Sequence, residues 1–211
     1  MKFLIPSRIV FQMFLAHDGW LNYFTKILKV VGSVIARLGS KRLVYKNILP
    51  YKGVPLALRA VKKLLACDFI NQVVLSTDSE LIARTCMGVG IEILQRPPEL
   101  AGDSVASVPV FQHIVEHFPC EVHLNYNCNF PECTEAVLEK AVGLARESGE
   151  ALSVPYAAWA QTSDCLLNYG DPMRITATRF ETAEVHPIDI HSMDDLLEVH
   201  RDNQSDLFWE K

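Results

Sequence analysis

Residues 30–47 have the sequence Val-Val-Gly-Ser-Val-Ile-Ala-Arg-Leu-Gly-Ser-Lys-Arg-Leu-Val-Tyr-Lys-Asn, in which an apolar run leads directly into a basic loop. The β-branched run Val30–Ala36 predicts a buried strand. Four positive charges then fall within ten residues, at Arg37, Lys41, Arg42 and Lys46. Ligands of open α/β sheets bind at the carboxyl ends of parallel strands, and Gly39 lets the backbone approach them closely. The stretch therefore predicts a phosphate-binding loop, with a solvated basic turn as the alternative.

The composition is that of an ordinary globular protein. Of 211 residues, 49% are hydrophobic and 21% are charged, so the chain fits one domain with a single core. A net charge of −5 argues against a nucleic-acid partner. The six cysteines form no CxxC pair, which favours reduced thiols and a cytoplasmic location. Arg8 interrupts the apolar run Met1–Ala16, so we expect neither a cleaved signal nor a membrane partner.

The pattern divides the chain into an N-terminal extension over residues 1–28 and a domain over residues 29–211. From Lys29 on, β-branched runs alternate with amphipathic helical stretches, which is typical of βαβ units. The expected strands are Val30–Ala36, Gln72–Ser76, Ile91–Leu94, Glu121–Asn125, Ala151–Pro155 and Val185–Ile190. Helices are expected over 54–65 and 138–145, and after capping-box patterns at Thr77–Glu80 and Ser192–Asp195. The result is an α/β fold with a mostly parallel sheet flanked by helices.

Further motifs follow the basic loop in order. The loop itself is Arg37-x-Gly-Ser-Lys-Arg-x-x-x-Lys-Asn47. The others are Gly-Val-Pro-Leu at 53–56, Val-Val-Leu-Ser-Thr-Asp at 73–78, Arg-Pro-Pro-Glu-Leu-Ala-Gly-Asp at 96–103 and Ile-Asp-Ile-His-Ser-Met-Asp-Asp-Leu at 188–196. Together they resemble the cytidylyltransferase family of CMP-sugar synthetases over residues 29–201. The likeness is to the CMP-N-acylneuraminate (sialic acid) synthetases, with the CMP-KDO synthetases as more distant relatives.

This resemblance implies a Rossmann-like nucleotide-diphospho-sugar transferase fold and a reaction between CTP and a 2-keto sugar acid that gives CMP-sugar and pyrophosphate. Positioned cations should stabilise the charge that spreads over the phosphoryl oxygens. Arg37 and Lys46 are the expected catalytic residues. The expected nucleotide-binding residues are Arg37, Gly39, Ser40, Lys41, Arg42, Lys46, Asn47, Arg96 and Asp103. The resemblance also implies Mg²⁺ at Asp189 and His191, sugar contacts from Asn125 and Asn127, and a homodimer. Arg96 and Asp103 are equally expected as ion pairs that hold a loop.

Four positions depart from the family's pattern. Val44-Tyr45 replaces a Pro-Gly pair, so the loop loses the backbone freedom of glycine. Asn125–Pro131 replaces a Gln-Pro-Thr-Ser-Pro-Leu-Arg segment that frames base and sugar, although asparagines can hydrogen-bond either. His191 replaces the second aspartate of an Asp-x-Asp motif, and imidazole is a poor magnesium ligand. Only about thirty residues lie between 155 and 185, so the segment for sugar binding and dimer formation is largely missing.

These departures support other hypotheses. One is a catalytically silent homologue that binds nucleotide or a protein partner. Another places the function in residues 1–28, which would dock the domain on a partner or a membrane. Histidines and cysteines also gather between residues 113 and 133: His113, His117, Cys120, His123, Cys128 and Cys133. Their spacing matches no zinc motif, so we interpret them as core or solvated side chains.

Overall fold

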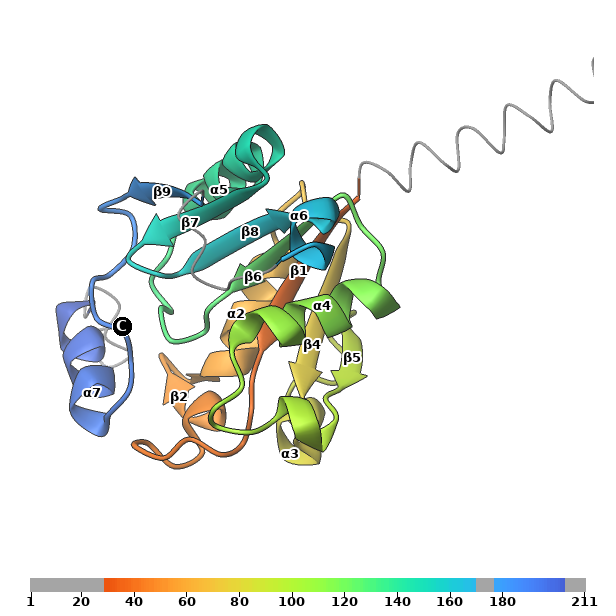
Figure 1. Ribbon diagram of the computed structural model, residues 1–211. Helices are drawn as coiled ribbons and strands as arrows, with labels where there is room; N and C mark the ends of the chain where they lie inside the picture. The colour runs from red at the N-terminus through yellow and green to blue at the C-terminus, as the bar shows by residue number, and fades with distance from the viewer. Residues whose placement is uncertain (1–28, 170–176, 204–211) are drawn as a thin grey trace, which may run out of the picture.

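The computed structural model describes residues 29–169 and 177–203, and the extension expected over residues 1–28 lies outside these ranges. A seven-stranded sheet with the order β5-β4-β1-β6-β8-β7-β9 forms its centre (Figure 1). The strands are β1 (Val30–Ile35), β4 (Gln72–Thr77), β5 (Glu92–Gln95), β6 (Val122–Tyr126), β7 (Glu150–Val154), β8 (Ala158–Thr162) and β9 (Thr178–Glu181). A hairpin of β2 (Pro50–Tyr51) and β3 (Val54–Pro55) lies apart from this sheet.

The first half of the sheet is parallel, as predicted. β1 pairs in parallel with β4 on one side and with β6 on the other, so that Ser33 lies opposite both Val74 and Asn125. Residues 30–34 of β1 are all buried. Helices cover both faces of a parallel sheet, so side chains on both sides of such a strand lie in the core and the strand is mostly apolar. This confirms the α/β class and the predicted strands of this half.

The second half of the sheet differs from the prediction. β8, which was not predicted, pairs antiparallel with both β6 and β7, and β9 then pairs in parallel with β7. The strand predicted over Val185–Ile190 is wrong: only Val185 forms an isolated bridge, with Cys133. Pro187 has no N–H to give to a ladder, and the segment is held instead by loop contacts such as that of His186 N with Glu132 O (2.9 Å).

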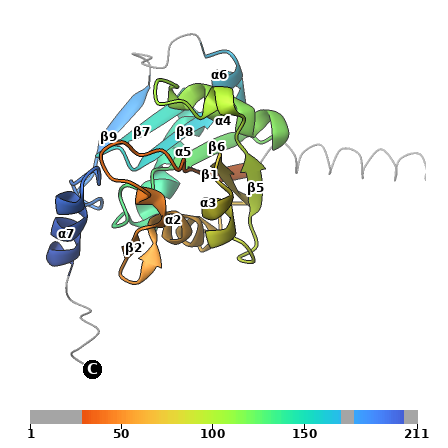
Figure 2. The ribbon, with the colours of Figure 1, turned by 90° about the horizontal axis from the view of Figure 1, so that it is seen from below.

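Helices cover the two faces of the sheet (Figure 2). On one face lie α2 (Leu56–Leu65), α3 (Glu80–Thr85) and α5 (Glu135–Ser148), which share the main core with β1, β4, β6 and β8. On the other lie α4 (Ser107–His117) and α6 (Ser163–Leu167), which contact each other. Two 3₁₀ helices, η1 (Lys46–Ile48) and η2 (Pro98–Leu100), lie in the loops after β1 and β5. No helix in the described ranges is both long and apolar enough to cross a membrane.

The last helix, α7 (Met193–Asp202), packs at the rim next to the β2–β3 hairpin (Figure 1). It begins with the predicted capping box, because Ser192 accepts from Asp195 N and the Asp195 side chain accepts from Ser192 N. The other predicted box is shifted: Ser79, not Thr77, caps α3 by accepting from Ile82 N. Both helix starts were therefore predicted within two residues.

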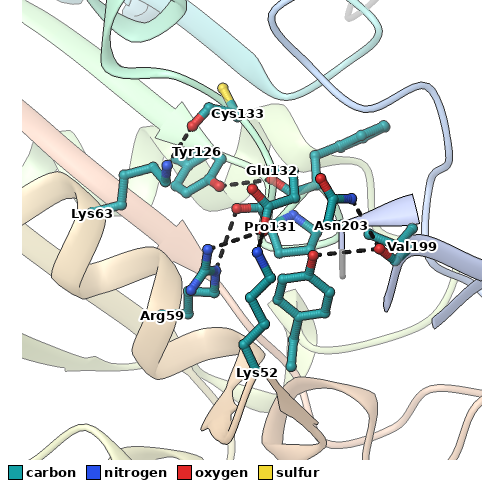
Figure 3. Close-up of polar contacts among 11 residues, drawn as sticks. Lys52, Arg59, Lys63, Tyr126, Pro131, Glu132, Cys133, Val199 and Asn203 are labelled. Carbon is teal, nitrogen blue, oxygen red and sulfur yellow. Dashed lines mark hydrogen bonds and ion pairs between the residues drawn. The ribbon is translucent and has the colours of Figure 1, made fainter. Parts of the chain in front are cut away.

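A polar cluster ties α2, the hairpin and the 131–133 segment together (Figure 3). Glu132 accepts ion pairs from Lys52 (3.3 Å) and Arg59 (3.1 Å). Lys63 donates a hydrogen bond to the carbonyl oxygen of Cys133. The Arg59 guanidinium lies over the ring of Tyr51, 5.1 Å from its centroid. The Tyr51 hydroxyl donates a hydrogen bond to the carbonyl oxygen of Val199 in α7 (3.5 Å). These contacts hold in place the loop that leads away from the carboxyl end of β6.

Candidate functional site

A cleft opens at the carboxyl edge of the parallel strands. From β1 the chain moves outward to β4 and β5 and then crosses to β6 on the other side of β1, so the strand order reverses between β1 and β6. Such switch points are where open α/β sheets bind ligands. The cleft has a volume of about 490 Å³. Eleven predicted site residues line it: Arg37, Ser40, Lys41, Arg42, Lys46, Asn47, Arg96, Asp103, Asn125, Asn127 and His191.

Two cations of the basic loop converge on one carboxylate. Arg37 Nη1 lies 2.9 Å from Asp103 Oδ1, and Lys41 Nζ lies 2.6 Å from Asp103 Oδ2. The hydrogen bond from Lys41 lowers the pKa of Asp103, which therefore stays ionised. Asp103 thus both lines the cleft and forms the ion pairs that hold its loop. Gly39 is not among the lining residues, and a side chain there would meet no atom within 4 Å.

Lys46 is the most buried cation of the loop. Only 9% of the residue is exposed, and burial lowers the pKa of its ammonium. Its Nζ donates to the carbonyl oxygen of Ile190 (3.1 Å). The preceding residue, Tyr45, adopts φ 58° and ψ 23°, which is the left-handed conformation that a glycine adopts easily. The backbone at this point therefore keeps a shape suited to the family's glycine although tyrosine occupies the position.

Arg96 and Asn47 brace the edges of the cleft. Arg96 is 5% exposed and donates from Nη2 to the carbonyl oxygen of Ser76 (2.8 Å), at the end of β4. Burial lowers the pKa of its guanidinium to about 10, so it stays charged at neutral pH. Asn47 Nδ2 donates to the carbonyl oxygen of Arg37 (2.8 Å), which closes the basic loop on itself. Both side chains are held by protein groups and also face the cleft.

The asparagine segment after β6 forms the cleft wall opposite the basic loop. Asn127 Nδ2 donates to the carbonyl oxygen of Tyr156 (3.2 Å), and Asn127 Oδ1 accepts from Asn129 N (3.1 Å). Cys128 donates from Sγ to Asn47 Oδ1 (3.2 Å), which joins the two walls. Burial raises the pKa of the Cys128 thiol, so it is a neutral hydrogen-bond donor here and not an activated nucleophile.

Several lining residues were not predicted. They include Ala106 and Ser107 at the start of α4, together with Cys128, Asn129 and Tyr156. The first residues of α4 have no side-chain cap, so backbone N–H groups at the cleft are open to an anion. The helix itself has a sequence signal, since Val108, Phe111 and Val115 recur at helical spacing and are buried. Tyr156 comes from the β7–β8 turn, which only the unpredicted antiparallel strand brings to the cleft.

Asp189 and His191 lie together, but their arrangement suits a divalent cation only in part. His191 Nε2 is 3.0 Å from Asp189 Oδ2, while Asn129 Nδ2 donates to Asp189 Oδ1 (2.8 Å). Both carboxylate oxygens are therefore engaged by protein groups, and Asp189 does not line the cleft. One carboxylate fits Mg²⁺, which proteins bind through one or two carboxylates plus substrate phosphates and water, whereas the imidazole does not.

The histidines and cysteines between residues 113 and 133 do not assemble a metal centre. Within residues 29–169 and 177–203, no group of three His, Cys, Asp or Glu side chains is placed to hold a metal ion. The rings of His113 and His117 on α4 lie 4.5 Å apart at a tilt of 58°, while His123 packs against Phe111 in the interior. His123, Cys128 and Cys133 are buried, whereas His117 is exposed.

A cation-lined cleft at the switch point of a mostly parallel sheet is typical of α/β proteins that bind phosphate-bearing ligands. The chain belongs to the cytidylyltransferase family, whose model matches residues 31–206. A relative from Danio rerio, N-acylneuraminate cytidylyltransferase A, is 31% identical over 117 residues. That match covers 55% of this chain but only 27% of the length of the relative.

Solved structures share the fold at low sequence identity. A CMP:2-keto-3-deoxy-manno-octonic acid synthetase complexed with CTP superposes with a TM-score of 0.69 at 16% identity, covering 82% of this chain and 97% of the other. Rv0371c of Mycobacterium tuberculosis H37Rv, solved in complex with manganese, has a TM-score of 0.61 at 16% identity, covering 82% and 98%. The match over nearly the whole of these chains confirms the predicted nucleotidyltransferase fold.

Proposed function

We propose that the cleft binds CTP and transfers its cytidylyl group to a sialic-acid-like 2-keto sugar acid, giving CMP-sugar and pyrophosphate. The observation that carries this proposal is the convergence of Arg37, Lys41, Arg42, Lys46 and Arg96 on one cleft in a chain of net charge −5. A volume of about 490 Å³ is within the usual range for small-molecule sites. The cytoplasmic location and the homodimer stay predictions.

In the proposed reaction, the anomeric hydroxyl oxygen of the sugar acid bonds to the α-phosphorus. The bond from that phosphorus to the bridging oxygen of the β-phosphate breaks, pyrophosphate keeps the electron pair, and the hydroxyl proton passes to solvent. Arg37 and Lys46 neutralise charge on the phosphoryl oxygens, with Lys41 and Arg42 assisting. Burial strengthens the contribution of Lys46, because its ammonium acts where water is scarce.

Asp189 would hold a divalent cation, Mg²⁺ in this proposal, and that ion would supply positive charge to offset the charge of the triphosphate. For Asp189 to take part, its Oδ2 must turn from His191, to which it is bound at 3.0 Å. The protein's own cations align the phosphates in either case.

The contact between Asp189 and His191 also supports a second candidate function. Since Asn129 and His191 occupy both oxygens of Asp189, a protein that binds nucleotide without turnover is the rival. Such a homologue would use the basic loop for binding and leave the metal position unused.

Calorimetry with CTP, UTP, ATP and GTP, with and without Mg²⁺, separates these possibilities when it is combined with a pyrophosphate-release assay. We expect CTP to bind most tightly and pyrophosphate to appear only when N-acylneuraminate or KDO is added with Mg²⁺. Tight CTP binding without pyrophosphate across such acids would establish the silent homologue. Absence of binding by every nucleotide would contradict both.

A further inference from the structure

A row of buried polar side chains crosses the sheet beneath α4 and α6 and ends at the cleft. Its members are Glu150 on β7, Gln161 on β8, His123 on β6, Ser33 on β1 and Asn125 on β6. Each is 2% exposed or less, and only Asn125 lines the cleft. Buried polar groups are costly unless hydrogen-bonded, so the bonds along this row constrain one another.

Hydrogen bonds link Glu150 to Gln161 at one end of the row and His123 to Ser33 and Asn125 at the other, with Gln161 and His123 facing each other between them. Gln161 Nε2 donates to Glu150 Oε1 (3.3 Å), which also accepts from Trp159 Nε1 (2.8 Å). His123 lies directly opposite Gln161 in the β6–β8 register, and the Gln161 side chain favours the protonated form of its ring. His123 Nδ1 and Gln161 Oε1 are both buried, and neither has a hydrogen-bond partner in the described part of the chain, so each atom lacks the partner that the other could supply.

Trp159 sets the direction of these bonds. Its indole N–H can only donate, so Glu150 Oε1 is an acceptor, and Gln161 turns its NH₂ toward this oxygen and its carbonyl oxygen toward His123. Burial lowers the pKa of His123 to about 4, so at neutral pH the ring carries a single N–H. We assign that hydrogen to Nδ1, from which a small side-chain adjustment would let it donate to Gln161 Oε1, an acceptor that has no other donor. Nε2, at 2.8 Å from Ser33 Oγ, is left to accept the serine hydroxyl.

We propose that Glu150, acting through Gln161, His123 and Ser33, fixes Asn125 with its amide oxygen facing the cleft as a hydrogen-bond acceptor. The one hydroxyl hydrogen of Ser33 is used by His123, so Ser33 Oγ accepts from Asn125. In the structure Ser33 Oγ donates to Asn125 Oδ1 at 3.5 Å. The proposal exchanges the amide oxygen and nitrogen of Asn125 by a half-turn, which puts Nδ2 beside Ser33 Oγ and Oδ1 toward the cleft.

The inference rests on the proposed function and adds a specificity rule to it. Asn125 would select a ligand group that donates a hydrogen bond, which is either the amino group of the cytosine base or a hydroxyl of the sugar acid. The other four residues of the row are positioning residues, since only Asn125 faces the cleft. None of them was singled out for this role by the sequence motifs.

The tautomer of His123 is a direct test that does not depend on turnover. The ¹⁵N shifts of the imidazole, assigned by comparison with His123→Gln, should show the Nδ1–H form at neutral pH in the full chain. An Nε2–H ring would overturn the proposal, whatever the chain binds. An Nδ1–H ring in a chain that binds no CTP would leave the hydrogen-bonded relay from Glu150 to Asn125 in place while refuting the proposed function.

Variants separate a positioning role from a structural one. Gln161→Met removes both hydrogen bonds of the amide, and should shift the ring from Nδ1–H and weaken ligand binding about 3- to 10-fold, the effect of one lost hydrogen bond. The double variant Glu150→Leu, Gln161→Leu replaces the polar pair by apolar groups, so Tm should recover while binding stays weak. Gln112→Met is the matched control, since Gln112 donates to Leu166 O (2.9 Å) on the same face and does not line the cleft.

Measurements with CTP, UTP and the sugar acid identify which ligand group donates to Asn125. If the Gln161 variants lose CTP affinity but keep UTP affinity, Asn125 accepts from the amino group of the base. If both nucleotides bind as before and KM for the sugar acid rises, it accepts from a sugar hydroxyl. Binding and KM that recover together with Tm in the double variant, or that never change, would overturn the relay.

Discussion

The ammonium of Lys46 donates a hydrogen bond to the carbonyl oxygen of Ile190, 144 residues further along the chain (3.1 Å). The acceptor lies between Asp189 and His191, so this contact brings the proposed metal position to the basic loop. Because the acceptor is a backbone atom, the contact survives the family departure at His191. The relationship makes Lys46 both a phosphate ligand in the proposal and the residue that positions the C-terminal segment.

Replacing Lys46 by methionine should therefore remove activity without unfolding the domain. We expect turnover to fall by about 100-fold or more, the range for losing one positioned electrostatic donor. Stability should change little, because burial already disfavours the ammonium, as its lowered pKa indicates. Pyrophosphate release and thermal unfolding measure the two effects. Lys62→Met, at an exposed position on α2, is the control, and an equal loss in both variants would contradict the role of Lys46.

His191→Asp should restore a second carboxylate beside Asp189. We expect turnover to rise several-fold and to saturate at lower Mg²⁺ concentration, since oxygen ligands suit this ion and imidazole does not. Titration of Mg²⁺ in the pyrophosphate assay measures the change. The control is His186→Asp, whose ring pairs with Asp202 (3.1 Å) away from the cleft. An unchanged Mg²⁺ requirement in the His191 variant would count against metal binding at this position.

Tyr45→Gly should stabilise the protein. Tyr45 is 51% exposed and holds φ 58°, a conformation that is costly for a residue with a side chain. After the greater flexibility of glycine in the unfolded chain is subtracted, we expect a gain of about 0.5–1 kcal/mol in the free energy of unfolding. Val44→Gly is the control: its φ is not positive, so the same change should destabilise. Urea denaturation resolves the two signs, and a loss of stability in both variants would refute the explanation.

His123 should make the protein less stable in mild acid. Its pKa is lowered from 6.5 to about 4 by burial, so below pH 6.5 the unfolded chain takes up a proton that the folded chain does not. Stability therefore falls as pH drops through this window, by roughly 3 kcal/mol in all. Urea denaturation at several pH values measures the slope. His123→Gln should be less stable overall but should lose this part of the slope, and an unaltered slope would contradict the assignment.

The basic loop was predictable because all of its chemistry lies within residues 37–47. The strand, the positive charges and the motif all lie in this one short segment. Together with residues from later motifs, eleven of the predicted site residues line one cleft. The strands of the parallel half were equally predictable from the sequence, since burial on both faces favours continuous apolar, β-branched runs. Asp189 and Gly39 were placed near the cleft but not in its lining.

What could not be predicted depends on contacts between distant segments. The antiparallel β8 has no run as strong as that of β1, and it brings Tyr156 to the cleft through its turn. The left-handed φ of Tyr45 contradicts local preference and is imposed by the fold around it. The Val185–Ile190 run has strand-like composition, but among the described residues only Val185 pairs with another segment, through a single bridge to Cys133.

The hydrogen bond from Lys46 to Ile190 also bears on the order in which the chain folds during synthesis. Strands β1 to β9 all end by Glu181, so a nascent chain could complete its sheet before the segment that closes the cleft has left the ribosome. Nucleotide affinity would then be acquired last, as a late event in synthesis. A ligand that requires both Lys46 and the segment around Ile190 would bind only molecules in which these two parts of the chain have already come together.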